Sequence, residues 1–157
     1  MESVLNEVLA LLGERWTLLL VREVALGVRR FEELVAALGT PRSLLAQRLR
    51  QLVAAGIVEP RTYRVPGGRP RCEYVLTGAG FDLLPALAAL SDWGDKHLAH
   101  RGDRDVTYCH SGCGQHVVAQ LVCVCGQPTD PRTDLIASVT RVAAAPARTW
   151  RDGLDGT

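Results

Sequence analysis

The 157-residue sequence lacks any hydrophobic run that approaches the roughly 20 residues needed to span a bilayer, so we expect no contact with a membrane. It also lacks the marks of a signal peptide. The first residues, MESVLNEVLALLGERW, are acidic ahead of their apolar stretch, with no basic n-region and no small-residue cleavage site. Without an export signal the predicted location is the cytoplasm, where free or metal-bound thiols are expected more than disulfides.

Glutamate is missing from the second half of the chain, where no Glu follows Glu73. Four of the five cysteines lie in that half, and a catalytic zinc site there would need an open coordination position and a neighbouring general base. A thioredoxin-type Cys-x-x-Cys on a βαβ unit is absent as well. We therefore expect no enzyme, neither a zinc hydrolase nor a thiol oxidoreductase.

The net charge of +1 conceals an uneven distribution. Residues 1–71 carry 11 arginines, no lysine and 7 acidic residues, whereas residues 72–157 carry 7 basic and 10 acidic ones. A front half that is basic through arginine alone indicates an anionic partner such as nucleic acid. An ordinary solvated surface would give the same count, so the charge leaves both interpretations open.

Apolar residues follow a helical period through the first 55 residues. The predicted helices are residues 4–12, 15–27, 31–38 and 41–55. The second is so continuously apolar that its pattern also allows a strand. Thr40 is expected to cap the fourth helix, with Pro41 at its first position. The short turn before this helix gives the third and fourth helices helix-turn-helix spacing.

The period changes after Gly56. IVEPRTYRV and CEYVLT predict two strands of a hairpin whose loop, PGGRPR, is basic. A long amphipathic helix over residues 78–97 follows, capped by Thr77 and bent at Pro85. The fold class is therefore mainly α with a small β-hairpin (α+β), a winged helix-turn-helix with a long helix and a small Cys-rich appendage. We expect three regions: residues 1–100, 101–130 and 131–157.

Within the later regions, VVAQLVCV predicts a short strand and residues 134–142 a short helix, ahead of a disordered tail of about 12 residues.

The fourth helix has the two faces that a helix in the major groove needs. Opposite its leucines, at about 100° per residue, lie small and polar residues: Ser43, Ala46, Gln47, Arg50 and Ala54. Ser and Gln can reach base edges or phosphates, and Arg can read guanine or hold a phosphate. Arg42 and Arg48 lie at the flanks, closer to the DNA backbone. Arg48 could instead be a structural residue that pairs with an acid of the domain.

The hairpin carries Arg64, Arg69 and Arg71 around a flexible Pro-Gly-Gly loop. Cations on such a loop suit a contact with phosphates or with the minor groove. A plain surface hairpin with solvated arginines is the alternative. The combination of two helices, a short turn and a basic hairpin is much more specific evidence for a DNA-binding fold than any one of these elements.

Residues 3–97 resemble the HxlR family of bacterial winged helix-turn-helix regulators. The matching features are Trp16 in a buried helix, RRFEEL, LAQRLRQLVAAGIVE, EYVLT-x-x-G and the LxxWG ending, in the same order and spacing. The resemblance implies a homodimer that binds inverted-repeat operator DNA near promoters. It also implies a dimer interface built from the N-terminal helix and the long helix, with these residues: Leu5, Leu9, Phe81, Leu84, Leu87, Leu90 and Trp93. The alternative for the apolar face of the long helix is a core role within one chain.

The sequence departs from the family at one place. Many members carry a cysteine just before the first helix, used in redox or electrophile sensing, but here that position falls near Ser3 and MESVLNEV has no cysteine. This argues against a thiol switch there. Cys72, in the predicted wing strand, is best interpreted as an inert small residue.

YCHSGCGQHVVAQLVCVCG, residues 108–126, holds four of the five cysteines. Tetrahedral zinc takes four N or S ligands, often as two closely spaced pairs, and the pairs here are His110 with Cys113 and Cys123 with Cys125. Cys109 could replace His110 in the first pair. The segment resembles a truncated zinc ribbon, although its second pair is C-x-C rather than C-x-x-C. A structural zinc, a cysteine cluster that only ties down the tail, and a redox or metal-sensing site stay open.

We therefore predict a sequence-specific DNA-binding transcriptional regulator, a homodimeric repressor or autoregulator. Its expected partners are double-stranded DNA and a second copy of the chain, with a small-molecule effector left open and structural zinc as the one cofactor considered. The alternatives are a winged-helix module that binds proteins and a redox or metal-responsive sensor that uses the cysteine cluster.

Overall fold

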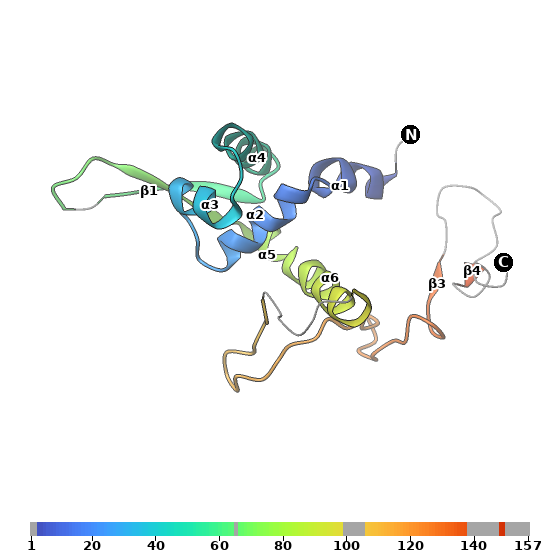
Figure 1. Ribbon diagram of the computed structural model, residues 1–157. Coiled ribbons are helices and arrows are strands. Elements are labelled where there is room, and N and C mark those ends of the chain that lie inside the picture. The colour runs from blue at the N-terminus through green and yellow to red at the C-terminus, as the bar shows by residue number, and fades with distance from the viewer. Residues whose placement is uncertain (1–2, 65, 99–105, 138–147, 150–157) are drawn as a thin grey trace. The chain divides into compact units, whose positions relative to one another are not determined.

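The computed structural model describes residues 3–64, 66–98, 106–137 and 148–149 (Figure 1). Contacts within the chain divide it into two units, one that ends at Ser91 and one that begins at Asp92. In the part of the chain described, no helix is both long and apolar enough to cross a membrane.

Four helices come first in the chain. They are α1 (Val4–Leu12), α2 (Arg15–Ala25), α3 (Phe31–Leu38) and α4 (Arg42–Ala54). The segment whose pattern also allowed a strand is thus the helix α2, and its Leu20 and Val21 are fully buried. An 11-residue apolar element is longer than most strands, and as a helix it pairs all of its interior backbone groups within itself.

The turn between α3 and α4 is short. Gly39 ends α3 in the left-handed region (φ 59°), where glycine pays no steric cost, and its N–H donates to the carbonyl of Val35 at 3.0 Å. The predicted start of α4 is wrong by one residue, because Pro41 is its N-cap in an extended conformation and Arg42 is its first residue. Thr40 is therefore one position too early to cap the helix, and its hydroxyl is buried with no hydrogen-bond partner among the described residues.

The wing is a two-stranded antiparallel sheet of β1 (Val58–Tyr63) and β2 (Arg71–Leu76). Val58 pairs with Leu76 at the base, where both side chains are buried, and Tyr63 pairs with Arg71 near the tip. The hairpin extends away from the helices (Figure 1). Burial at its base fixes the register, since a slip of one residue would turn the buried side chains outward.

The predicted helix over residues 78–97 is two helices, α5 (Gly78–Phe81) and α6 (Leu84–His97). The predicted cap is confirmed, because the Thr77 hydroxyl oxygen accepts the N–H of Gly80 at 3.2 Å. Pro85 is the second residue of α6. Proline has no N–H to donate, and within one continuous helix its ring would clash with the carbonyl four residues earlier, so the chain breaks instead of bending.

The core of the first unit is built mainly of leucine and valine. Its fully or almost fully buried members come from α2, α3, α4 and β1: Leu20, Val21, Leu34, Leu45, Leu49, Leu52 and Val58. Full burial of a Leu or Val side chain stabilises a fold by about 1.5–3 kcal/mol, so these residues hold α3 and α4 firmly on α2.

The second unit has little regular structure in its described residues. The predicted strand over residues 117–124 is wrong, since only isolated bridges form, and β3 (Ile136–Ala137) pairs with β4 (Arg148–Thr149). A strand needs a partner that pairs with it along its length, whereas each isolated bridge pairs only one residue with one other. The helix predicted over residues 134–142 is wrong at β3, because so short a segment does not offset the cost of helix nucleation. Residues 134 and 135 are not helical either, and residues 138–142, like all but two of the last dozen residues, lie outside the described residues.

Candidate nucleic-acid interface

One face of α4 is polar and open to solvent. Ser43, Gln47 and Arg50 recur at i, i+4 and i+7, so they lie on one side of the helix, and all three side chains are exposed. The opposite side carries the buried leucines that anchor the helix. The core thus fixes which face α4 presents, and that face offers a hydroxyl, an amide and a guanidinium to a partner.

Arg50 is the cation at the end of this face. No acidic group among the described residues forms an ion pair with it, and its side chain is exposed. Within the described part of the chain, Arg50 therefore has no ion pair to give up when its guanidinium binds a base or a phosphate.

Arg42, by contrast, is already engaged. Its two terminal nitrogens donate to the two carboxylate oxygens of Glu32 on α3, and its guanidinium lies 5.3 Å from the ring centroid of Phe31. This hydrogen bonding holds the pKa of the Glu32 carboxyl below its usual range and raises the pKa of Arg42. The pair is fully exposed, so it ties α3 to α4 without removing Arg42 from the surface.

Arg48 has the structural arrangement that the sequence left open. Its Nη2 lies 3.1 Å from a carboxylate oxygen of Glu14, and its Nη1 donates to the side-chain oxygen of Gln51 at 2.9 Å. Only 13% of its side chain is exposed, and Nε is buried with no partner among the described residues. Arg48 joins α4 to the start of α2, so the geometry favours packing over contact with DNA.

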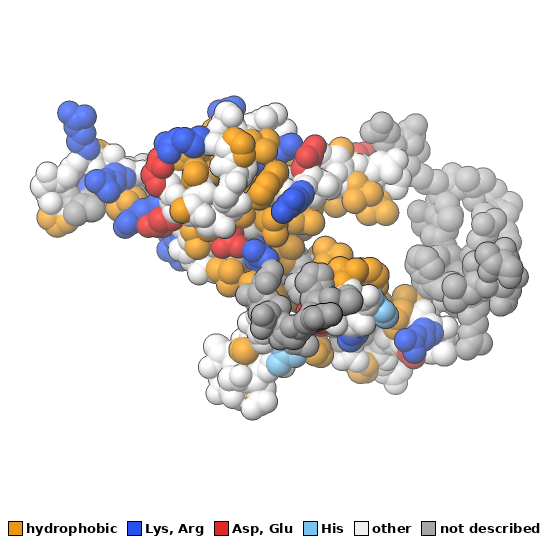
Figure 2. All heavy atoms as spheres, viewed as in Figure 1, with side chains coloured by type: hydrophobic (Ala, Val, Ile, Leu, Met, Phe, Trp, Pro, Cys, Tyr) orange, Lys and Arg blue, Asp and Glu red, His pale blue; other side chains and the backbone are white. Residues whose placement is uncertain are grey.

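The wing presents its arginines to solvent. Arg64, Arg69 and Arg71 are all exposed, and Figure 2 shows basic side chains over the wing and over the helices beside it. At the far end of β1, the guanidinium of Arg30 lies 5.2 Å from the ring centroid of Tyr63, which holds the residue before α3 against that strand. The first unit therefore holds two basic elements, α4 and the wing, on one folded core.

The residues predicted for a dimer interface divide into two groups. Leu87 is buried in the core of its own chain and Leu84 packs against that core, as the intramolecular alternative has it. The others are more than half exposed: Leu5, Leu9, Phe81, Leu90 and Trp93. On α1, Val4 and Val8 extend the exposed apolar face, and α1 has only one buried residue, Leu12.

The predicted metal ligands lie in the second unit as two pairs. His110 Nδ1 is 3.2 Å from Cys113 Sγ, and Cys125 lies close enough to Cys123 to affect its pKa. Hydrogen bonds from Cys125 and from the backbone of Val124 lower the pKa of Cys123. In the residues described, no three His, Cys, Asp or Glu side chains converge on one point.

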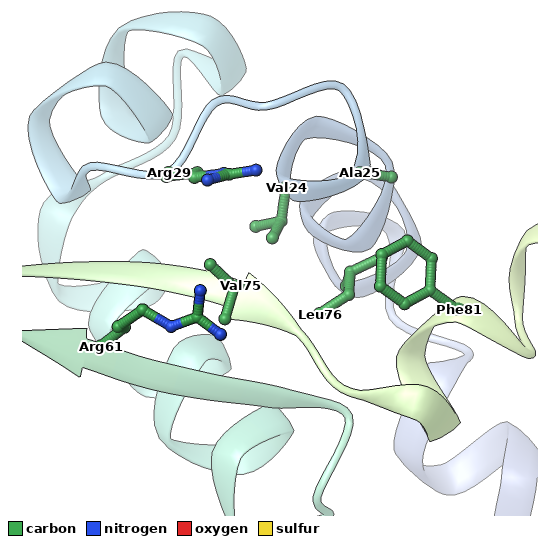
Figure 3. A pocket seen from close by; sticks show the side chains of 7 residues that line it. All are labelled: Val24, Ala25, Arg29, Arg61, Val75, Leu76 and Phe81. Carbon is green, nitrogen blue, oxygen red and sulfur yellow. The ribbon is translucent and has the colours of Figure 1, made fainter. Parts of the chain in front are cut away.

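A recess of about 180 Å³ lies in the first unit between α2, the base of the wing and α5. Its wall is apolar, with Val24, Val75 and Leu76, and Phe81 of α5 lies at one side (Figure 3). Two arginines border it: Arg29 from the loop after α2 and Arg61 from β1.

Comparison with known proteins identifies this arrangement. The family model for HxlR-like helix-turn-helix proteins matches residues 11–102. The chain belongs to the HxlR-like helix-turn-helix family. An uncharacterised HTH-type transcriptional regulator of Mycobacterium tuberculosis is 43% identical over 134 residues, which cover 83% of this chain and 82% of that protein. Another, from Synechocystis, is 39% identical over 94 residues, or 57% of this chain and 68% of that protein.

Solved structures agree with the HxlR-like assignment. The candidate transcription factor PA1607 has a TM-score of 0.75 at 29% identity and covers 90% of this chain and 96% of its own. The reduced form of the transcriptional regulator YodB from B. subtilis has a TM-score of 0.55 at 26% identity, and covers 63% of this chain and 96% of its own. The chain is thus a helix-turn-helix transcriptional regulator with the winged fold predicted from its sequence.

Sequence reasoning missed three residues of these sites. Glu32 follows directly on the aromatic residue that begins α3, and only the fold brings it to Arg42, ten positions later. Arg29 and Arg61 are 32 positions apart and both border the recess because β2, which pairs with β1, returns beside α2, where the N–H of Tyr74 donates to the carbonyl of Arg29. Their one signal in the sequence was the excess of arginine in the front half.

Proposed function

We propose that this HxlR-like protein is a sequence-specific DNA-binding repressor or autoregulator that acts as a homodimer on inverted-repeat operators. The observation that carries the proposal is the exposed face of Ser43, Gln47 and Arg50 on α4, a helix that the core holds rigidly. A helix in the major groove reads bases through such side chains, with Arg bidentate to guanine and Gln to adenine. DNA as the target also fits the cytoplasmic location that the sequence predicts.

The wing takes the second role. Arg64, Arg69 and Arg71 are exposed near a loop with no bulky side chain at Gly67 or Gly68, so their guanidinium groups can approach the DNA backbone. Contacts to phosphate position a protein but carry no sequence information. We therefore assign base reading to α4 and orientation to the wing. Arg42 contributes a phosphate contact only if DNA competes with Glu32 for its guanidinium.

A second copy of the chain is the proposed partner of α1. Four apolar side chains of this nine-residue helix, Val4, Leu5, Val8 and Leu9, are 41–68% exposed. A short helix with that much exposed apolar surface gains little stability alone. On α6, Leu90 and Trp93 are three residues apart and more than half exposed, so they extend the apolar surface available for dimerisation.

A separate part of the proposal is that the recess in the first unit binds a small-molecule effector. The recess between α2, β2 and α5 combines an apolar wall with Arg29 and Arg61, which suits a small apolar carboxylate. A ligand there would contact the base of the wing, so it could change how the wing meets DNA. Titration with a panel of aromatic monocarboxylates, with Arg29→Ala as the impaired variant, would test this part alone.

In the main experiment, the purified chain selects DNA from a random pool. Its affinity for the enriched sequence is then measured by fluorescence anisotropy. An enriched inverted repeat, bound by two chains, supports the proposal. The proposal would be overturned if no sequence were enriched. It would also be overturned if a variant with Ser43, Gln47 and Arg50 all replaced by alanine bound the enriched sequence as tightly as the unmutated chain. Arg132→Ala is the matched control, since Arg132 is an exposed arginine of the second unit.

A further inference from the structure

Two short loops in the second unit share one construction. The first is closed by an isolated antiparallel bridge between Cys109 and His116, and the second by a bridge between Val122 and Pro128. Both loops contain the tripeptide Cys-Gly-Gln. Sequence and backbone pairing agree, so the loops are built alike, although the first has one residue more before its Cys-Gly-Gln.

The hydrogen bonds inside the loops repeat as well. In each, the residue after the bridge donates its N–H to the carbonyl of the residue after the glycine: His110 to Gln115 at 2.9 Å and Cys123 to Gln127 at 2.8 Å. The glycine has a positive φ in both copies, 71° and 89°. Each loop therefore places a His or Cys at its start and a Cys just before its glycine, which is the arrangement of two matched ligand pairs.

The first pair has the spacing of two neighbouring zinc ligands. With Zn–S of about 2.3 Å and Zn–N of about 2.0 Å, two corners of a tetrahedron lie about 3.5 Å apart, and His110 Nδ1 lies 3.2 Å from Cys113 Sγ. Gly112 leaves space for the imidazole, since a Cβ at that position would lie only 2.9 Å from His110 Cε1. The loop thus holds His110 over its own turn and beside the cysteine.

The second pair holds two cysteines close together. Cys123 and Cys125 are two positions apart in one loop, and Cys125 lies near enough to lower the pKa of Cys123. Alternate positions in an extended segment put both side chains on one side, so C-x-C can hold a metal from that side. His110 and Cys123 occupy equivalent places in the two loops, which selects His110 over Cys109 as the first ligand.

The described part of the second unit has no core to hold these loops. Not one residue from 106 to 137 with a described side chain is buried, and Leu121 and Val122 are 52% and 58% exposed. Small units without a core are usually stabilised by metals or disulfides. All five cysteines are free thiols, and the two pairs do not meet in one site among the described residues.

We propose that the two loops together bind one zinc ion through His110, Cys113, Cys123 and Cys125, and that the ion draws the two pairs into one tetrahedral site. Three thiolates and an imidazole form a donor set typical of structural zinc. The three thiols release their protons on binding, so affinity falls at low pH. This inference rests on the second unit alone and stands apart from the proposed DNA contacts.

Metal analysis of the purified full-length chain, reconstituted with Zn²⁺ under reducing conditions, tests the proposal. The expected result is one zinc per chain, lost by more than half in Cys113→Ser and in Cys123→Ser. Cys72→Ser is the matched control, an exposed cysteine of β2 that should keep the metal. With Co²⁺ in place of zinc, strong visible bands from a tetrahedral thiolate site are expected.

Other results would overturn the proposal. One is a reconstituted chain with less than a tenth of an equivalent of zinc, or one with a disulfide, seen as a loss of two hydrogens by mass, and no metal. Retention of zinc in His110→Ala together with its loss in Cys109→Ser would overturn the ligand set. DNA affinity measured on the same variants keeps the two proposals separable, because zinc can fail while DNA binding stands.

Discussion

Arg48 Nη2 lies 3.1 Å from Glu14 Oε2, and this ion pair joins α4 to the residue that precedes α2. The arginine is 34 positions from its partner and nearly buried. Arg48→Ala is expected to lower the free energy of unfolding by about 1–3 kcal/mol, because it removes the pair, the bond to Gln51 and the packing of the arginine stem. Urea unfolding measures this, with exposed Arg50→Ala expected within about 0.5 kcal/mol of the unmutated chain. Equal stability of the two variants would show that Arg48 has no structural role.

Glu32 is expected to compete with DNA for the guanidinium of Arg42. Glu32→Gln should strengthen binding to any DNA sequence, because it removes a negative charge and releases the guanidinium. Anisotropy at two salt concentrations should show a steeper salt dependence than in the unmutated chain. Glu7→Gln, on exposed α1, removes the same charge elsewhere and should change affinity far less. Equal effects of the two changes would rule out the competition.

The same pair predicts a pH dependence. The pKa of Glu32 is held below its usual range by Arg42, so the pair contributes stability above the unfolded pKa of the carboxyl and loses it as the pH falls through the lower, folded pKa. The effect on unfolding is expected to be small and to disappear at high salt, since both groups are fully exposed. A pH series of urea unfolding, with Glu32→Gln as reference, checks it. A pH dependence that the variant keeps in full would assign it to other groups.

The substitutions Arg69→Ala and Arg50→Ala should weaken DNA binding in different ways. Arg69→Ala is expected to weaken specific and scrambled DNA alike and to lower the slope of log K against log salt by about 0.9, as the loss of one phosphate contact does. Arg50→Ala should weaken the specific sequence about 10- to 100-fold and the scrambled one much less. The two slopes and the two affinity ratios separate the roles. Identical behaviour of the variants would contradict the division between wing and helix.

Gly80 is a position where only glycine fits. A Cβ there would lie 2.3 Å from the carbonyl oxygen of Ile57, which already accepts the N–H of Thr77. Gly80→Ala should destabilise the first unit by about 1–3 kcal/mol, since the backbone on either side must shift. Gly78→Ala, two residues earlier, meets nothing within 4 Å and should be neutral or slightly stabilising. Thermal unfolding of the two variants compares them, and a tolerated Gly80→Ala would show that the backbone shifts at little cost.

Leu5→Glu tests the proposed dimer. A charge in the exposed apolar face of α1 should favour the monomer in light scattering, whereas Asn6→Glu adds the same charge beside that face and should leave the dimer largely intact. A monomeric unmutated chain, or a dimer that survives both changes, would remove α1 from the interface.

Local patterns in the sequence predicted most of the DNA-binding unit. Periodicity and capping rules located three features: the bounds of α1 and α3, the presence of the wing, and the cap at Thr77. Each of these depends on residues that lie close together in the chain. The start of α4 was missed by one residue because Pro41 serves as the cap itself. Pro85 was expected to bend a helix that it in fact breaks.

What the sequence could not predict depends on distant residues. The acidic partners of Arg42 and Arg48 and the recess between Arg29 and Arg61 need the fold to bring their members together, and only the fold decides that Leu87 lies in the core of its own chain. The structure of residues 117–124 was the hardest part to predict, because this segment has the composition of a strand but no partner strand among the described residues.

The most direct measurement compares the selected operator with a scrambled duplex of the same length and composition at one physiological salt concentration. The unmutated chain should bind the operator at least about 1,000-fold more tightly, the lower end of the range for specific regulators. The triple variant of Ser43, Gln47 and Arg50 to alanine should lose most of this ratio while its unfolding transition stays unchanged. An equal affinity of the unmutated chain for both duplexes, or a triple variant that keeps the full ratio, would contradict base reading by α4.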